Sequence, residues 1–157
     1  MRRTAGFTLF EAIVVVALVS LITAFSLPFA LNWKMKAVLN GNARMFATDL
    51  QKVKTNAIRL NCPLVFLFSE HGYRVFEDSG AGGAIRGDWK QTGQEATLGE
   101  KRFSEGIRFT HNFSAQRLRF SGSGGNKAGT AVFTTGNGRE ITVVLSVLGR
   151  IRITDMQ

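Results

Sequence analysis

Hydrophobic and polar positions divide the chain into three stretches with different patterns. Residues 12–33 are 22 consecutive uncharged residues, which as a helix would extend about 33 Å, against about 30 Å for the hydrocarbon core of a bilayer. Between residues 35 and 61 apolar residues recur in alternating steps of four and three, and after Pro63 the period shortens to two. This order predicts a membrane helix, an amphipathic helix and a β-rich domain.

The amphipathic stretch predicts a helix with one continuous apolar face. The residues of this stripe are Leu39, Ala43, Phe46, Leu50, Val53, Ala57 and Leu60. Their spacing places them on one side of a helix. Gly41 lowers helix stability by about 1 kcal/mol relative to Ala. Because Pro63 disfavours helical geometry at Cys62, the helix should end near Asn61.

The region after Pro63 has the composition and spacing of short strands separated by turns. Strands are predicted at residues 64–68, 73–76, 101–103, 107–109, 118–120, 131–135, 139–147 and 150–154, and flexible loops at 79–87 and 121–127. Residues 88–98 fit neither pattern clearly. The predicted fold class is α+β, a long N-terminal helix packed on an antiparallel β-sheet head domain.

Two features of the N-terminus need an explanation beyond helix length. Arg2 and Arg3 precede the apolar run, and Glu11 lies in its first turns. A secretory signal fits poorly, because no small-x-small cleavage site follows the apolar core. A single-span membrane anchor, with Arg2 and Arg3 on the cytoplasmic side, accounts for the basic start and the apolar run but not for Glu11. A carboxylate in lipid costs on the order of 2.5–3.5 kcal/mol and requires a partner.

The Gly6-Phe7 junction, with Glu11 following, resembles the type III leader of type IV pilins and pseudopilins. The resemblance implies that a prepilin peptidase cuts after Gly6 and methylates the new N-terminus at Phe7, leaving 151 of the 157 residues. It also implies that Glu11 pairs with the Phe7 amine of its own or a neighbouring subunit. Pairing makes two buried charges tolerable and sets the register between helices.

Pro28 lies inside the apolar run, where it removes a backbone hydrogen bond and predicts a kink or a locally melted helix. Pilins often have a proline at this place. The domains expected are a leader (1–6), the transmembrane half of the helix (7–33), its amphipathic half (34–62) and the head (63–157). The resemblance implies a single-pass protein of the bacterial inner membrane, with the head in the periplasm and later in a filament or its tip.

The C-terminal strands carry a second resemblance. The segments are Phe120-Ser-Gly, Gly129-Thr-Ala-Val-Phe, Ile141-Thr-Val-Val-Leu-Ser and Gly149-Arg-Ile-Arg. They are similar to the head domain shared by GspH and FimT, which are minor pseudopilins of type II secretion and minor pilins of type IV pili. Cys62 is the single cysteine, so the disulfide loop of many pilins cannot form. The implied function is assembly into, or priming of, a type IV pilus or a type II secretion pseudopilus, with other major and minor pilins or pseudopilins as partners.

Positive charge raises an alternative function. The formal net charge is +9 and the isoelectric point is near 10.6, which favours anionic partners or reflects a solvated basic surface. Strand alternation places Arg150 and Arg152 on one face, and Arg139 and Lys127 lie on neighbouring strands or turns, with Arg117 and Arg119 as further candidates. These cations either protect a sheet edge from aggregation or contact phosphates of double-stranded DNA without sequence preference.

The resemblance leaves both interpretations of the arginines open. Gly149-Arg150-Ile151-Arg152 matches the GRxR pattern of FimT-like minor pilins, some of which bind DNA during natural transformation. GspH-like chains also often end in Gly-Arg. A DNA-binding minor pilin for DNA uptake is therefore the alternative to a purely structural subunit.

Nothing in the sequence indicates catalysis. The Gly-rich segments lack the Gly-Lys-Ser/Thr ending of a phosphate-binding loop and a following helix. His71, His111 and Cys62 occur singly, without metal-ligand spacing. The acidic residues Glu70, Glu77 and Asp78 fit charged hairpin ends better than an acid–base pair. We expect no enzymatic activity, no cofactor and no metal.

Overall fold

The computed structural model describes residues 8–156, without the side chains of residues 25–28 and 156. Gly6 and Phe7 lie outside the described residues. The chain forms two compact units, Met1–Ala37 and Val38–Gln157. One helix, α1 (Leu9–Leu60), is followed by eight strands. The strands are β1 (Leu64–Ser69), β2 (Gly72–Glu77), β3 (Thr97–Arg102), β4 (Ile107–His111), β5 (Arg117–Phe120), β6 (Gly129–Thr135), β7 (Glu140–Leu145) and β8 (Ile151–Met156).

The first unit contains the apolar beginning of α1. The hydroxyl of Thr8 caps the helix by accepting a hydrogen bond from the Glu11 N–H over 3.2 Å. The hydroxyls of Ser20 and Thr23 donate to carbonyls one turn earlier, so neither leaves a polar group unpaired on the apolar surface. The helix continues through Pro28 without interruption. The locally melted helix that was one of the two expectations for this position is therefore not observed.

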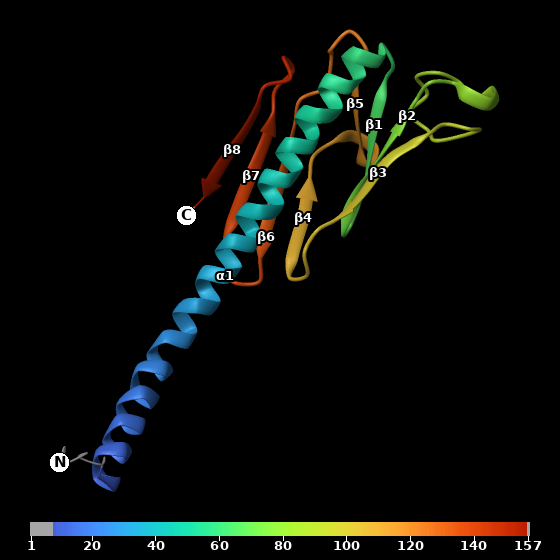
Figure 1. The fold of residues 1–157 in the computed structure, drawn as a ribbon. Coiled ribbons are helices and arrows are strands. Elements are labelled where there is room, and N and C mark those ends of the chain that lie inside the picture. The colour runs from blue at the N-terminus through green and yellow to red at the C-terminus, as the bar shows by residue number, and fades with distance from the viewer. Residues whose placement is uncertain (1–7, 157) are drawn as a thin grey trace, which may run out of the picture. The chain divides into compact units, whose positions relative to one another are not determined.

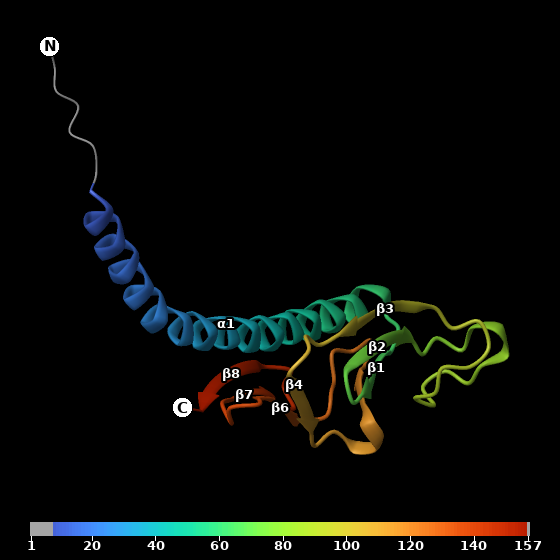
Figure 2. The same ribbon diagram turned by 90° about the horizontal axis from the view of Figure 1, so that it is seen from below.

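The second unit is the head domain, formed by the C-terminal part of α1 and two antiparallel sheets (Figure 1). The first sheet has the strand order β3-β2-β1-β5, and the second has β4-β6-β7-β8. Figures 1 and 2 show that residues 38–60 of α1 cross one face of both sheets. The predicted α+β class is confirmed, and the strands form two sheets instead of one.

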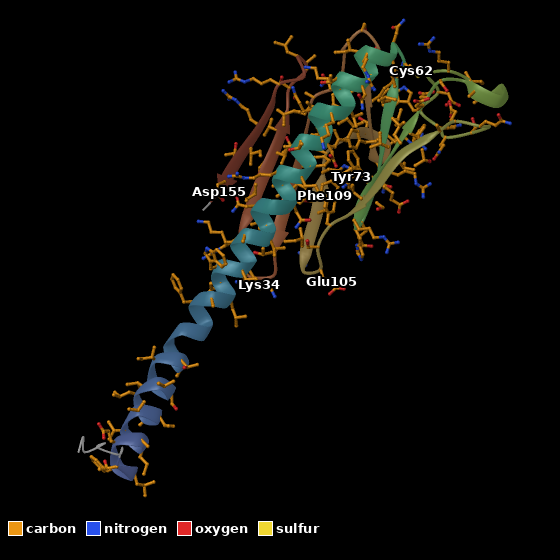
Figure 3. All side chains as sticks on the ribbon, in the orientation of Figure 1. Lys34, Cys62, Tyr73, Glu105, Phe109 and Asp155 are labelled. Atoms are coloured by element: carbon orange, nitrogen blue, oxygen red, sulfur yellow. The ribbon has the colours of Figure 1, made fainter. Side chains whose placement is uncertain are left out.

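The core lies between this part of α1 and the two sheets. Phe46 is fully buried and its ring contacts six other aromatic rings, three from the first sheet, two from the second and one from the β3–β4 connection. These rings belong to Phe66, Phe68, Tyr73, Phe103, Phe109 and Phe133. Figure 3 shows Tyr73 and Phe109 beside the helix where it crosses the strands. A single helical side chain thus joins both sheets.

The predicted helical stripe is confirmed, with a correction at its end. Its residues from Leu39 to Ala57 are at most 8% exposed, whereas Leu60 is 45% exposed. Leu60 is the last residue of α1, and Cys62 beyond it is half-buried. Asn61 adopts a left-handed backbone conformation (φ 46°), which ends the helix where Pro63 predicted.

Candidate functional site

Glu11 lies in the first turn of α1 with its side chain exposed, three residues after the capping Thr8. This Thr-x-x-Glu spacing is that of a capping box. A carboxylate in this turn also interacts favourably with the positive end of the helix dipole. The local structure therefore orders the residues around the predicted pairing position, while the Phe7 amine lies outside the described residues.

The surface of the first unit provides the second functional feature. The large apolar side chains described between Leu9 and Trp33 are at least 40% exposed, and the most apolar 18 residues of this helix are not buried at all. The helix is long and apolar enough to cross a membrane. Exposed apolar area of this extent requires lipid or other apolar helices as surroundings.

The four cations predicted to contact DNA do not form one cluster. Arg139 precedes β7, and Arg150 follows the turn at the other end of the same strand. Six strand residues separate these ends by about 20 Å. Arg152 pairs with Val144 and lies on the face away from the core, as the alternation predicted. A continuous basic track along this sheet is therefore absent from the residues that the structure describes.

Lys127 instead joins a basic and aromatic group on the first sheet, which we call the Trp89 hollow. Its ammonium Nζ lies 5.3 Å from the centroid of the Trp89 ring, and the Arg119 guanidinium carbon lies 5.8 Å from it. Both distances fall in the range of cation–π attraction. Ser121, Gly125 and Asn126 complete the lining of this open hollow of about 240 Å³. The sequence had suggested Arg119 as a neighbour of Lys127, without Trp89.

Two buried carboxylates fix the loop that carries Trp89. Asp78 is fully buried, and its carboxylate accepts hydrogen bonds from the N–H groups of Gly87 (2.6 Å) and Trp89 (3.1 Å). Glu95 accepts from Gly80 and Thr92 in the same way, at 3.1 and 3.0 Å. Asp78 is therefore a structural anchor and not a hairpin-end charge. No sequence pattern indicates this role, because both acids accept hydrogen bonds from backbone groups that any residue other than proline supplies.

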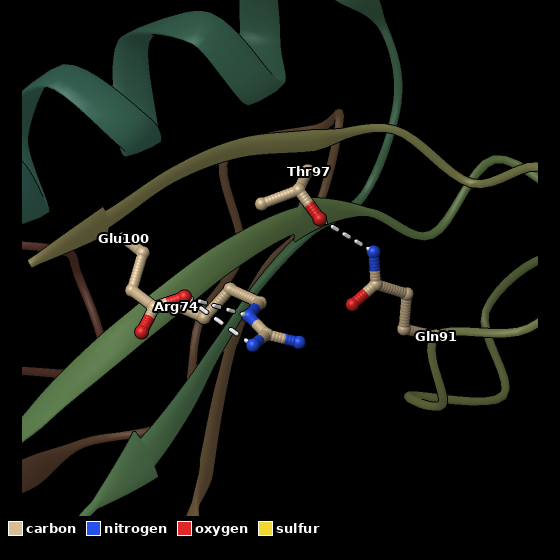
Figure 4. Close-up of polar contacts among 4 residues, drawn as sticks. All are labelled: Arg74, Gln91, Thr97 and Glu100. Carbon is tan, nitrogen blue, oxygen red and sulfur yellow. Dashed lines mark hydrogen bonds and ion pairs between the residues drawn. The ribbon is translucent and has the colours of Figure 1, made fainter.

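Polar contacts elsewhere in the head connect loops and strands. Asn42, buried on α1, accepts from the Ser104 N–H and donates to its hydroxyl, which fixes the β3–β4 connection against the helix. On the outer side of the first sheet, Arg74 pairs with Glu100 and the Gln91 amide donates to Thr97 (Figure 4). The ion pair is about half-exposed on both sides, so it contributes little to stability.

The Tyr73 hydroxyl donates a hydrogen bond of 2.5 Å to the Asp49 carboxylate on α1. Burial, followed by this hydrogen bond and the charge of Asp49, raises the pKa of Tyr73 far above its usual value. His111 packs against Phe68 with ring centroids 4.8 Å apart, and burial lowers its pKa. Both rings pack among the aromatic side chains of the core.

Comparisons with known proteins agree with this geometry. The profile of a prokaryotic N-terminal methylation motif matches residues 1–27. The profile of the family described as Type II transport protein GspH matches residues 42–149, more than half of the chain. No curated protein matches the chain in sequence.

Solved structures share the fold at low sequence identity. The minor pseudopilin EpsH of the Vibrio cholerae type II secretion system is 12% identical with a TM-score of 0.60, covering 78% of this chain and 97% of its own. The type IV minor pilin FimU of Pseudomonas aeruginosa is 14% identical with a TM-score of 0.60, covering 78% and 92%.

Escherichia coli GspH gives a TM-score of 0.58 at 13% identity, covering 76% of this chain and 89% of its own. Similar structures thus come from both secretion and pilus machines. The methylation motif and the apolar helix indicate leader processing, membrane anchoring and assembly with other pilin-like subunits. Together with the matched family profile, these findings show that the chain belongs to the GspH family of minor pseudopilins and minor pilins.

Proposed function

We propose that this subunit is anchored in the bacterial inner membrane with its head in the periplasm, and that it primes or joins a type IV pilus or a type II secretion pseudopilus. The observation that supports this most directly is the exposed apolar surface of residues 9–33, preceded by a methylation motif at residues 1–27. Such a surface contacts lipid before assembly and packs against neighbouring helices afterwards.

The proposed activity is assembly without catalysis. Cleavage after Gly6 releases the Phe7 amine, and Glu11 on the exposed first turn pairs with such an amine in the filament. Each charge alone is costly in an apolar surrounding, so the pair forms only in the correct register. The structure gives no support to the DNA-binding alternative, because Arg139 is separated from Arg150 and Arg152 by the length of β7.

Substitution of Gly6 tests the proposal. We expect Gly6→Val to block leader removal, so that the intact mass stays six residues above the mature form. Ala5→Val adds the same side chain one position earlier and serves as the matched control, which should be cut normally. Normal processing of Gly6→Val, with methylation at Phe7, would contradict the proposed role of this junction.

A further inference from the structure

We propose that the Trp89 hollow is a docking site for a carboxylate side chain on the head of a neighbouring subunit. The proposal rests on the proposed function, since it requires that the chain assemble with other subunits. It assigns a ligand class to a part of the head, the loop between β2 and β3, for which the sequence predicted no role.

The hollow lies on the face of the first sheet opposite the helix. Arg119 pairs with Val65 in register, whereas the adjacent pair, Leu118 with Phe66, belongs to the core. Because side chains alternate along a strand, Arg119 points to the outer face. Trp89 reaches it there from the β2–β3 loop, and Lys127 from the β5–β6 connection.

The position of Trp89 is fixed before any ligand binds. Its backbone has a left-handed conformation (φ 66°), which is unusual for a residue other than glycine. The buried Asp78 holds this conformation through the N–H groups of Gly87 and Trp89. A backbone that is held in an unfavourable conformation by a buried carboxylate is typical of a preformed functional loop.

The two cations in the hollow lack a negative partner. The described residues contain no carboxylate within ion-pair distance of Arg119 or Lys127, since the ion pairs are Lys52–Asp49 and Arg74–Glu100. Arg119 Nε is buried without a hydrogen-bond partner. Both cations line one hollow around a single indole ring, and two unpaired like charges in the same hollow favour an anion as its occupant.

Size and surroundings select the kind of anion. The hollow measures about 240 Å³ and has six lining residues, which suits one acidic side chain. A nucleic acid strand needs a basic groove that follows its backbone and free aromatic faces for base stacking. Here both cations already lie against the Trp89 ring, and Arg139 lies at the far end of the second sheet. A carboxylate on a neighbouring head is therefore the occupant that fits.

Fluorescence of Trp89 in the full chain tests the site directly. The chain has two tryptophans, so Trp33→Phe leaves Trp89 as the reporter in protein held in detergent micelles. The probe is a blocked tri-glutamate peptide, with blocked tri-glutamine as the neutral control. We expect a saturable change with tri-glutamate only, weakened by salt because the contact is ionic.

Variants of the two cations show whether tri-glutamate binds in the Trp89 hollow. Arg119→Gln and Lys127→Gln should each weaken tri-glutamate binding about tenfold, the loss expected for one charge-assisted hydrogen bond. Arg139→Gln removes the same charge at the far end of β7 and should bind as the parent does. Lys127→Arg keeps the charge and should retain binding. If Arg119→Gln does not fold, Lys127→Gln still tests the proposal, because Lys127 is exposed and its substitution should not disturb the fold.

Three outcomes would overturn the proposal. The first is no saturable change with tri-glutamate, and the second is equal binding by Lys127→Gln and the parent. The third is tighter binding of a short oligothymidylate than of tri-glutamate, lost in the same variants, which would assign the hollow to nucleic acid. Co-purification of other pilin-like subunits with the protein separates this proposal from the proposed function. If Lys127→Gln is processed and membrane-bound but no longer co-purifies with neighbouring subunits, both stand. Processed, membrane-bound parent protein that does not bind tri-glutamate contradicts the docking site alone. Parent protein that is never processed contradicts the proposed function, on which the docking site depends.

Discussion

The two parts of α1 both carry large apolar side chains, but these have opposite surroundings. In residues 9–33, large apolar side chains such as Ile13, Leu18 and Ile22 are 55–65% exposed on all sides of the helix. In residues 38–60, the apolar side chains form one stripe that both sheets cover, with Phe46 fully buried at its centre. The first part can bury its apolar side chains only against lipid or other subunits, whereas the second buries them against the sheets of its own chain.

This difference explains how one helix serves both anchoring and folding. The core of the head contains helix residues from Leu39 to Ala57, so we expect the stability of the head to depend on this second part. Substitutions in the first part should therefore alter membrane insertion and assembly, while equivalent substitutions in the second should unfold the head.

Removal of the central aromatic ring should have the largest effect. Phe46→Ala takes away the side chain that contacts six aromatic rings and leaves a cavity between α1 and the two sheets. We expect a loss of about 3–5 kcal/mol in the free energy of unfolding. Ile13→Ala, a large-to-small change in the exposed part of the helix, should leave the unfolding of the head unchanged. Denaturant titration of both variants in micelles measures the contrast, and equal losses would contradict it.

The Tyr73–Asp49 hydrogen bond should give a smaller, pH-dependent effect. Tyr73→Phe should lower stability by about 1–2 kcal/mol at neutral pH, because the Asp49 carboxylate loses its donor. The folded head raises the pKa of Tyr73 above its unfolded value, so the neutral hydroxyl is favoured on folding. This contribution is complete below the unfolded pKa, near pH 10, and is lost as the pH rises toward the folded pKa.

Ultraviolet absorbance checks this prediction, because Tyr73 is the single tyrosine. Tyrosinate should form in the folded protein only at a pH well above that of the unfolded chain in denaturant. The stability of the parent should fall more steeply above pH 10 than that of Tyr73→Phe. Ionisation at the same pH in both states would show that Tyr73 is not held by Asp49.

The smallest predicted effect is a gain in stability at Gly41. A methyl group added there meets no atom within 4 Å, and the residue is helical and exposed. Gly41→Ala should therefore stabilise the head by about 0.5–1 kcal/mol, because alanine loses less backbone freedom on folding. Thermal unfolding measures it, and a loss of stability would mean that the helix is not formed around Gly41.

Repeating local patterns allowed most of the fold to be predicted from the sequence. The stripe from Leu39 to Ala57 follows helical periodicity. The alternation in the last strand predicts that Ile151 and Ile153 share one face, and they pair with the buried Leu145 and Val143 of β7. The division into two sheets was not predicted, because strand order depends on contacts between distant segments that no local pattern records.

Among the functional residues too, some were predicted from a local sequence pattern and others were missed. Glu11 was identified because a charge in an apolar run is conspicuous in the sequence. The association of Lys127 and Arg119 through Trp89 was missed, since it joins two loops and a strand that lie far apart in the chain. Asn42 and Asp78 were also missed, because each acts through backbone or hydroxyl groups without a sequence signature.

Cysteine labelling tests the contrast between the two parts of α1 most directly. In a Cys62→Ser background, Ser20→Cys and Arg44→Cys place one thiol on each part of the helix, at positions that are both exposed in the fold. We predict that a membrane-impermeant maleimide applied to spheroplasts labels the Arg44→Cys variant rapidly and labels the Ser20→Cys variant only after detergent is added. Equal labelling of the two variants before detergent would contradict the claim that one helix serves two environments.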